Sequence, residues 1–261
     1  MKTPFKHSLL LMSLLIFFAG CSTTKILTVK PEILHFDTPE TSGGFLNGTA
    51  LFMAVGKTPI YEFGRATTSD FNGTTTALAD KEEVKVGSYY GLGLSLGLWD
   101  RIDIFTRARG MSGLKIQVIG SPRIKKEVGW KLALSAATGD YSYVETYQTF
   151  PFGSYDENSD FYVNGTSTDI TINTGYRFNP RILVYANVFR NQTEASGFYS
   201  NVSTSFRKER SHEAKGVLIG VNLTSNDYGF ATLEFGYARS KWSQLGTKTY
   251  TPAGISFGSY W

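Results

Sequence analysis

Hydrophobic and polar residues alternate along residues 84–98, VKVGSYYGLGLSLGL. Valine, tyrosine and leucine dominate one set of alternate positions, and glycine, serine and lysine dominate the other. A helix would mix these two sets on its surface, whereas a β-strand separates them onto opposite faces. The stretch is also longer than an ordinary strand, and its length suits a tilted strand that crosses a membrane.

The same separation into two faces recurs in residues 130–137, 169–177, 216–223 and 232–238. The less hydrophobic face of the first stretch is mostly glycine and serine, which make a poor water-exposed surface. Small residues do fit the crowded interior of a narrow barrel whose large side chains face lipid. We therefore predict an all-β fold, a closed antiparallel up-and-down transmembrane β-barrel over residues 43–261. A soluble lipocalin-like barrel with an apolar interior is an alternative.

The connections between the predicted strands are unequal. Short turns at 98–101, 177–181 and 224–229 alternate with long polar segments, expected to be loops, at about 57–82, 140–162, 190–212 and 241–250. Outer-membrane barrels have tight periplasmic turns and longer external loops. A hairpin at 110–113 brings the count to ten strands, with eight or twelve as alternatives, and an even number puts both barrel ends on the periplasmic side.

The only cysteine, Cys21, follows a basic start and the apolar run 8–18. The run is too short to span a bilayer as a helix, so a removable signal fits better than an anchor. Phe18-Ala19-Gly20-Cys21 resembles the lipobox of bacterial lipoproteins, which implies a signal peptide at 1–20 and a lipidated Cys21. Ordinary cleavage near Ala19 is the alternative. Residues 21–42 contain two prolines and no sustained period, which predicts an extended periplasmic tether without a fold of its own.

The last stretch, AGISFGSYW, alternates again and places Phe257 and Trp261 on one face. It resembles the C-terminal assembly signal of bacterial outer-membrane β-barrel proteins. This resemblance is one of class and names no activity. It implies an outer-membrane location, with outer-membrane lipids and the barrel assembly machinery as partners.

Composition narrows the function further. After Cys21 no thiol remains for a disulfide or a thiolate metal site, and we expect no cofactor or metal. The net charge of +4 is too small and scattered to indicate nucleic acid binding. The basic run 206–210 makes lipopolysaccharide a candidate partner. Ser211-His212-Glu213 has the residue types of a hydrolase, but neighbours on a strand point to opposite faces, and the other histidine of the mature chain, His35, lies in the tether. We therefore expect no enzyme, with a barrel hydrolase as a remote alternative.

Eight charged residues fall on the predicted inner face of the barrel, and basic groups outnumber acidic ones. They are Arg101, Asp103, Arg107, Lys115, Lys131, Asp169, Arg177 and Glu234. Buried charges are costly unless they are paired, so these groups are expected to form a plug of ion pairs. A narrow anion-preferring channel for small solutes is the alternative. The sequence thus predicts a lipid-anchored outer-membrane barrel with a structural or interaction role through its external loops.

Overall fold

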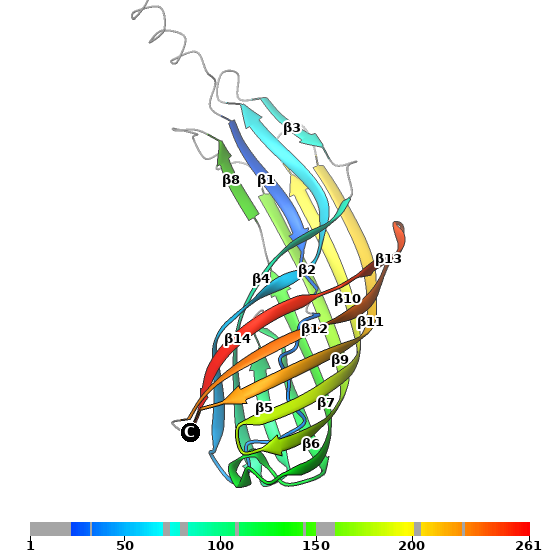
Figure 1. The fold of residues 1–261 in the computed structure, drawn as a ribbon. Coiled ribbons are helices and arrows are strands. Elements are labelled where there is room, and N and C mark those ends of the chain that lie inside the picture. Colours follow the sequence, from blue (N-terminus) through cyan, green and yellow to red (C-terminus); the bar gives the residue numbers. More distant parts are fainter. Residues whose placement is uncertain are drawn as a thin grey trace, which may run out of the picture.

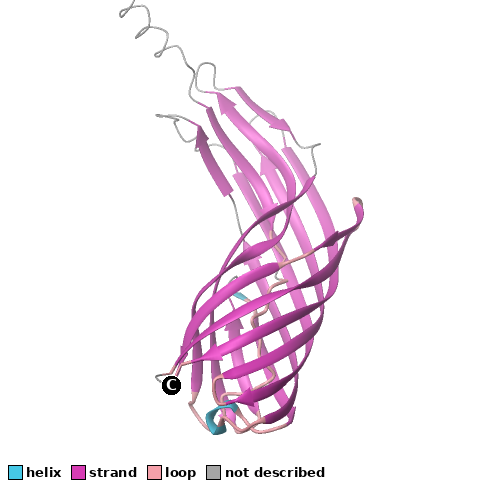
Figure 2. Cartoon of the chain, in the orientation of Figure 1, coloured by secondary structure: helices cyan, strands magenta, loops and turns pink. Residues whose placement is uncertain are grey.

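The computed structural model describes residues 22–261, except for residues 32, 70–73, 79–82, 108–109, 143–144, 150–159, 201–204 and 226–227. Most of the described chain is β-strand, and a 3-10 turn at Arg123–Lys125 lies in one connection (Figure 2). No helix in these ranges is long and apolar enough to span a bilayer. The predicted signal peptide and Cys21 lie outside the described residues.

Ten antiparallel strands close into a barrel (Figure 1). In chain order they are β2 (Gly48–Ser69), β4 (Glu83–Trp99), β5 (Ile102–Arg107), β6 (Ser112–Ile119), β7 (Gly129–Ser142), β9 (Asp160–Asn179), β10 (Ile182–Ser200), β11 (Ser205–Thr224), β12 (Gly229–Trp242) and β14 (Ala253–Tyr260). Each strand pairs with the next, and β14 pairs with both β12 and β2, which completes the ring. The predicted ten-strand barrel is confirmed, including the hairpin between β5 and β6.

The two ends of the barrel differ. At one end, called here the tight-turn end, short turns join β4 to β5, β9 to β10 and β11 to β12. The barrel also begins and finishes there, because the amide of Gly48 donates to the carbonyl of Trp261 at 3.1 Å. The opposite end is called here the projecting end. It carries the halves of the barrel strands that lie far from the tight turns, called here the upper halves. It also carries four short strands, namely β1 (Ser22–Val29), β3 (Thr74–Leu78), β8 (Glu145–Thr149) and β13 (Gly246–Tyr250).

Much of the chain that was expected to form long loops is strand at the projecting end. For example, β10 and β11 pair without interruption from Ile182↔Leu223 to Ser200↔Ser205. These upper halves are rich in threonine, serine, asparagine and charged residues on both faces. Hydrophobic alternation therefore disappears there, although backbone pairing continues, and the prediction of loops was wrong.

The N-terminal part of the described chain runs through the barrel. Residues 31 and 33–43 are buried, apart from the half-buried Asp37. The prediction of an unfolded tether is therefore wrong, because residues 22–29 form β1 and residues 31 and 33–42, called here the luminal segment, fill the interior. Ile33 packs with Phe189 and Leu218, and Leu34 and Phe36 pack with Ala54. Apolar side chains with no place in a solvated linker are thus buried inside the barrel.

Glycines on the inner wall make room for this segment. A Cβ atom at Gly254 would lie 2.8 Å from the ring of Phe36, and one at Gly97 would lie 2.4 Å from the carbonyl oxygen of Gly44. The small residues predicted to fill a narrow interior therefore accommodate an additional length of chain.

Candidate functional site

The contacts between the luminal segment and the barrel wall form the most highly organised polar site in the described part of the chain. At the tight-turn end, Arg177 of β9 donates to both carboxylate oxygens of Glu40, from Nε at 2.7 Å and from Nη2 at 2.5 Å. Lys131 of β7 places its Nζ 3.8 Å from the same carboxylate. All three side chains are at most 1% exposed, so these ion pairs replace the interactions with water that the charged groups lose on burial.

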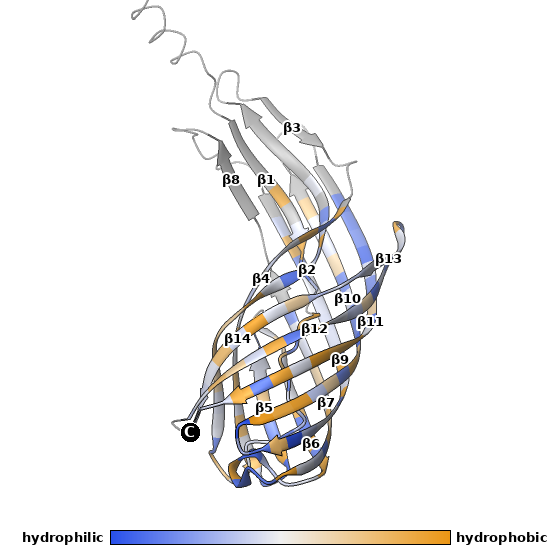
Figure 3. Cartoon of the chain, viewed as in Figure 1, coloured by the Kyte–Doolittle hydropathy of each residue, from blue (hydrophilic) through white to orange (hydrophobic). Residues whose placement is uncertain are grey.

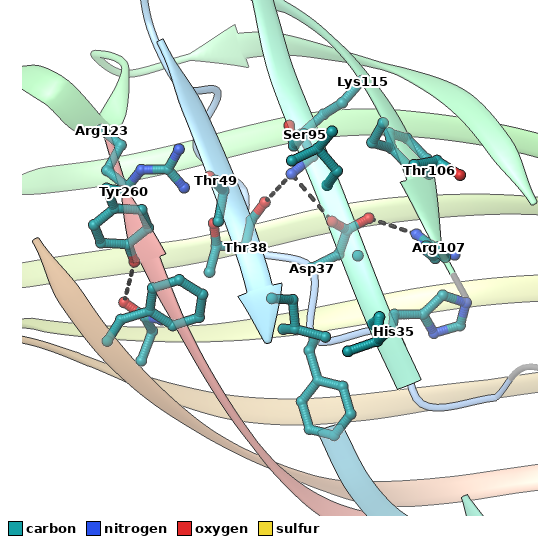
Figure 4. A pocket seen from close by; sticks show the side chains of 18 residues that line it. His35, Asp37, Thr38, Thr49, Ser95, Thr106, Arg107, Lys115, Arg123 and Tyr260 are labelled. Atoms are coloured by element: carbon teal, nitrogen blue, oxygen red, sulfur yellow. Dashed lines mark hydrogen bonds and ion pairs between the residues drawn. The ribbon is translucent and has the colours of Figure 1, made fainter. Parts of the chain in front are cut away.

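A second group of charges lies nearer the N-terminal end of the segment, where Figure 4 shows Asp37 between Arg107 and Lys115. Arg107 of β5 donates to Asp37 at 2.6 Å, and the Nζ of Lys115 of β6 lies 3.1 Å from the other carboxylate oxygen. Arg107 also reaches Asp169 of β9 at 3.5 Å. Asp37 therefore bridges the basic groups of β5 and β6, and Arg107 extends this network to β9.

Glu234 of β12 holds the backbone of the segment. One of its oxygens accepts the amides of His35 and Phe36 at 2.9 and 3.0 Å, and the other accepts from Tyr185 and Asn187. The Nε2 of His35 lies 2.9 Å from Asp169. Two neighbouring amides that have no strand partner are thus satisfied by one buried carboxylate.

The segment is fastened again where it leaves the barrel. Asp103 of β5 accepts the amide and hydroxyl of Ser42 at 2.8 and 3.0 Å. Gln117 of β6 accepts the amide and hydroxyl of Thr41 at 2.9 and 2.8 Å. Arg123, from the 3-10 turn, donates to the hydroxyl of Ser42 and lies over the ring of Tyr260.

Seven of the eight charged residues proposed for the inner face have their side chains inside the barrel, and every one of the seven contacts or approaches the luminal segment. Arg101 is the exception. It belongs to the exposed turn between β4 and β5 and donates to the carbonyl of Val118, so its assignment to the lumen was wrong.

Sequence reasoning missed the partners of these charges, which are His35, Asp37 and Glu40, together with Gln117 and Arg123. The available signal was the excess of basic over acidic groups on the predicted inner face. Such an excess in a narrow interior requires counter-charges from elsewhere, and the preceding segment carries them.

An apolar cluster fills the interior towards the projecting end. It consists of Val29, Tyr61, Val84, Val163, Ala195 and Trp242. Tyr61 and Trp242 stack with ring centroids 4.1 Å apart. Val84, expected on the lipid side, belongs to this cluster instead. The cavity drawn in Figure 4, beside Asp37 and Lys115, has only about 70 Å³ of water-accessible space, so a few water molecules would fill it.

The exterior is apolar on the half of the barrel next to the tight-turn end. Outward-facing positions there include Tyr90, Leu92, Ile170 and Phe235, each more than half exposed. Figure 3 shows hydrophobic and hydrophilic residues interspersed along the strands of this half. The alternate, inward positions are buried, and many of them are polar, such as Asn173, Asn187 and Thr232. This distribution is the reverse of that in a water-soluble barrel and argues against the lipocalin-like alternative.

Basic residues border this apolar exterior on three neighbouring strands. Arg190, Lys215 and Arg239 are paired in register on β10, β11 and β12, next to the row Val188, Val217 and Tyr237. Glu213 lies one position further out and contacts both Arg190 and Lys215, at 2.7 and 3.1 Å. The row is therefore held with its charged groups directed away from the apolar surface.

The residues considered for catalysis do not come together. Ser211 and Glu213 face outwards, whereas His212 is buried on the inner face and bonds the hydroxyl of Ser240 at 2.7 Å. The Nδ1 of His212 has no hydrogen-bond partner among the described residues. No carboxylate orients this histidine in the described structure, and Ser240 is only 1% exposed.

The residues of the C-terminal stretch lie on the outer surface. Phe257 faces outwards from β14, and Trp261 is half exposed beside Gly48. This placement leaves their proposed role in assembly as a prediction.

No protein-family model and no curated protein sequence matches this chain. Three solved structures of outer-membrane proteins are similar to it. The attachment invasion locus protein Ail of Yersinia pestis is 10% identical, with a TM-score of 0.36 over 84% of this chain and 99% of Ail. The N-terminal β-barrel domain of Pseudomonas aeruginosa OprF is 14% identical, with a TM-score of 0.31 over 82% of this chain and 98% of that one.

The outer membrane protease OmpT of Escherichia coli is 10% identical, with a TM-score of 0.33 over 92% of this chain and 95% of OmpT. The chain resembles outer-membrane β-barrel proteins as a class.

Proposed function

We propose that this protein is an outer-membrane β-barrel closed by its own N-terminal segment, and that it acts through its projecting end as a structural or interaction protein. The observation that carries this proposal is the luminal segment, whose carboxylates complete the ion pairs of the barrel wall. Neither solute passage nor catalysis is part of the proposed role.

The apolar exterior supports the membrane location. A belt of aliphatic and aromatic side chains around a closed barrel has no role in water, whereas lipid chains cover it without leaving a backbone edge unpaired. The tight-turn end corresponds to the periplasmic side of such barrels, and the long projecting end to the outside. The polar surface that partners can reach then lies on the upper halves of β9, β10 and β11.

The charge of the lumen argues against an anion-preferring channel. Five buried basic groups line the path of the segment in the described structure, namely Arg107, Lys115, Arg123, Lys131 and Arg177. Five acidic groups lie along the same path, namely Asp37, Glu40, Asp103, Asp169 and Glu234. Of these, Asp37, Glu40 and Asp169 form ion pairs with the basic groups. The basic excess expected from the wall alone is thus balanced by the two carboxylates of the segment.

We propose lipids as the main partners of the outer surface of the barrel. Arg190, Lys215 and Arg239 border the apolar belt where lipid phosphates lie, which supports contact with outer-leaflet lipids, including lipopolysaccharide. The basic run 206–210 contributes less charge than the sequence implies, because Arg207 pairs with Glu209 at 2.9 Å. Recognition by the barrel assembly machinery through Phe257 and Trp261, and lipidation at Cys21, complete the proposal.

Recordings from planar lipid bilayers test the closed lumen. The full chain should insert without stable conductance, whereas Asp37→Lys places a third cation against Arg107 and Lys115 and should displace the segment, giving discrete conductance steps. Glu213→Lys, on the outer surface, is the matched control and should stay silent. Stable, anion-preferring steps from the unmodified protein would show that the lumen conducts and would overturn the proposal.

A further inference from the structure

The luminal segment runs through the barrel from the projecting end to the tight-turn end. Val29, the last residue of β1, pairs with Tyr61 of β2 and packs against Trp242 towards the projecting end. The following residues descend through the lumen until Gly48 meets Trp261 at the tight-turn end. Figure 1 shows β1 and the end of β14 at opposite ends of the molecule. Ser22 therefore lies far from both termini of the barrel itself.

The first strand is part of the wall at the projecting end. The pairing between β14 and β2 stops at Ala253↔Lys57, and β1 occupies the same edge of β2 from Tyr61 to Ser69. The other edge of β1 pairs with β8, from Ile26↔Glu145 to Ser22↔Thr149. β1 thus covers an edge of β2 that would otherwise stay unpaired, and this backbone pairing stabilises β1 in its position.

Attachments along its length oppose withdrawal of the segment. They include the bonds from His35 and Phe36 to Glu234, the Asp37 ion pairs and the Glu40–Arg177 pair. Withdrawal would leave Lys115 and Arg177 inside the barrel without a carboxylate partner among the described residues and would leave Arg107 with Asp169 but without Asp37, and unpaired buried charges are strongly unfavourable. The segment is also closely packed against the wall, since a Cβ at Gly56 would lie 2.3 Å from Leu34.

From this geometry we infer that the protein displays its N-terminal strand on the outer surface of the membrane, after passing it through its own barrel. The inference rests on the proposed outer-membrane orientation. It replaces the expected periplasmic tether, because residues 22–29 belong to the outer side.

Labelling of intact cells with a membrane-impermeant maleimide tests this inference. Thr24→Cys reports on β1, Gln244→Cys reports on the β12–β13 turn at the same end, and Asp100→Cys reports on the tight-turn end. The unmodified chain gives the background from Cys21. Thr24→Cys should be labelled on intact cells to the same extent as Gln244→Cys, and Asp100→Cys should be labelled only after permeabilisation.

The other outcomes separate two failures. If Gln244→Cys is labelled on intact cells and Thr24→Cys only after permeabilisation, β1 lies in the periplasm, which overturns the inference and leaves the orientation of the barrel intact. If neither is labelled on intact cells and Asp100→Cys is, the barrel is inverted, and the inference fails together with the proposed orientation.

Discussion

The Glu40–Arg177 pair provides the sharpest energetic test of a filled lumen. Glu40→Leu leaves Arg177 buried with only the carbonyl of Pro180 as a bonded partner in the described structure, and it removes the carboxylate 3.8 Å from Lys131. Removing one member of a buried ion pair costs about 3–5 kcal/mol. Because two cations lose their counter-charge, Glu40→Leu should lie towards the upper part of that range.

Two further variants test whether the loss of stability comes from the Glu40–Arg177 pair itself. Arg177→Met should cost less than Glu40→Leu, because Lys131 remains near the carboxylate of Glu40. The double variant Glu40→Leu/Arg177→Met removes both charges and should be more stable than Glu40→Leu alone, as expected when apolar groups replace a buried pair. The exposed pair Arg190–Glu213 is the control, and Arg190→Met should change the free energy of unfolding by at most about 1 kcal/mol.

Urea-induced unfolding in lipid vesicles, followed by tryptophan fluorescence and by gel mobility before and after boiling, measures these differences. If Glu40→Leu and Arg190→Met prove equally mild, Glu40 is solvated and the segment does not occupy the lumen. A double variant as unstable as the sum of the single variants would show that Glu40 and Arg177 do not interact.

Three further predictions concern the exterior, the wall and the N-terminus. Leu94→Arg puts a charge on the lipid-facing surface and should cost about 2–4 kcal/mol in the same unfolding assay, more than Leu94→Ser; equal effects would mean that position 94 does not meet lipid. Gly97→Val should destabilise the barrel more than Gly229→Val, because a Cβ at Gly97 would lie 2.4 Å from the carbonyl oxygen of Gly44 whereas the nearest atom to one at Gly229 lies 3.9 Å away; the reverse order would show that the chain at Gly44 does not pass Gly97. Cys21→Ala should abolish incorporation of labelled palmitate, and unchanged labelling would show that Cys21 is not the lipid attachment site.

The barrel could be predicted from the sequence because the pattern that specifies it lies within single strands. Along β4, β7 and β11, lipid on one side and a crowded interior on the other impose a strict two-residue alternation. The hairpin between β5 and β6 could also be placed, since Gly110 supplies the positive φ angle that its turn requires. The number of strands followed from these two signals.

The contents of the lumen could not be predicted in the same way. The luminal segment has no sustained period: Ile33 packs against Phe189 and Leu218, whereas the next residue, Leu34, packs with Phe36 against Ala54. Its ion pairs join residues distant in sequence, such as Glu40 with Arg177, so no spacing rule applies to them. The projecting strands were missed for a related reason, because polar and charged residues occupy both faces of much of their length. The hydrophobic alternation is therefore lost while the backbone pairing of β10 with β11 persists.

The central claim is that the luminal segment lies inside the barrel, and amide hydrogen exchange of the folded protein in lipid nanodiscs tests it most directly. The amides of His35, Phe36, Thr41 and Ser42 each donate to a carboxylate or amide side chain of the wall. They should exchange as slowly as the neighbouring strand amides of β9 and β12. Exchange of these four amides at the rate of an unstructured peptide, while the strands remain protected, would contradict the account.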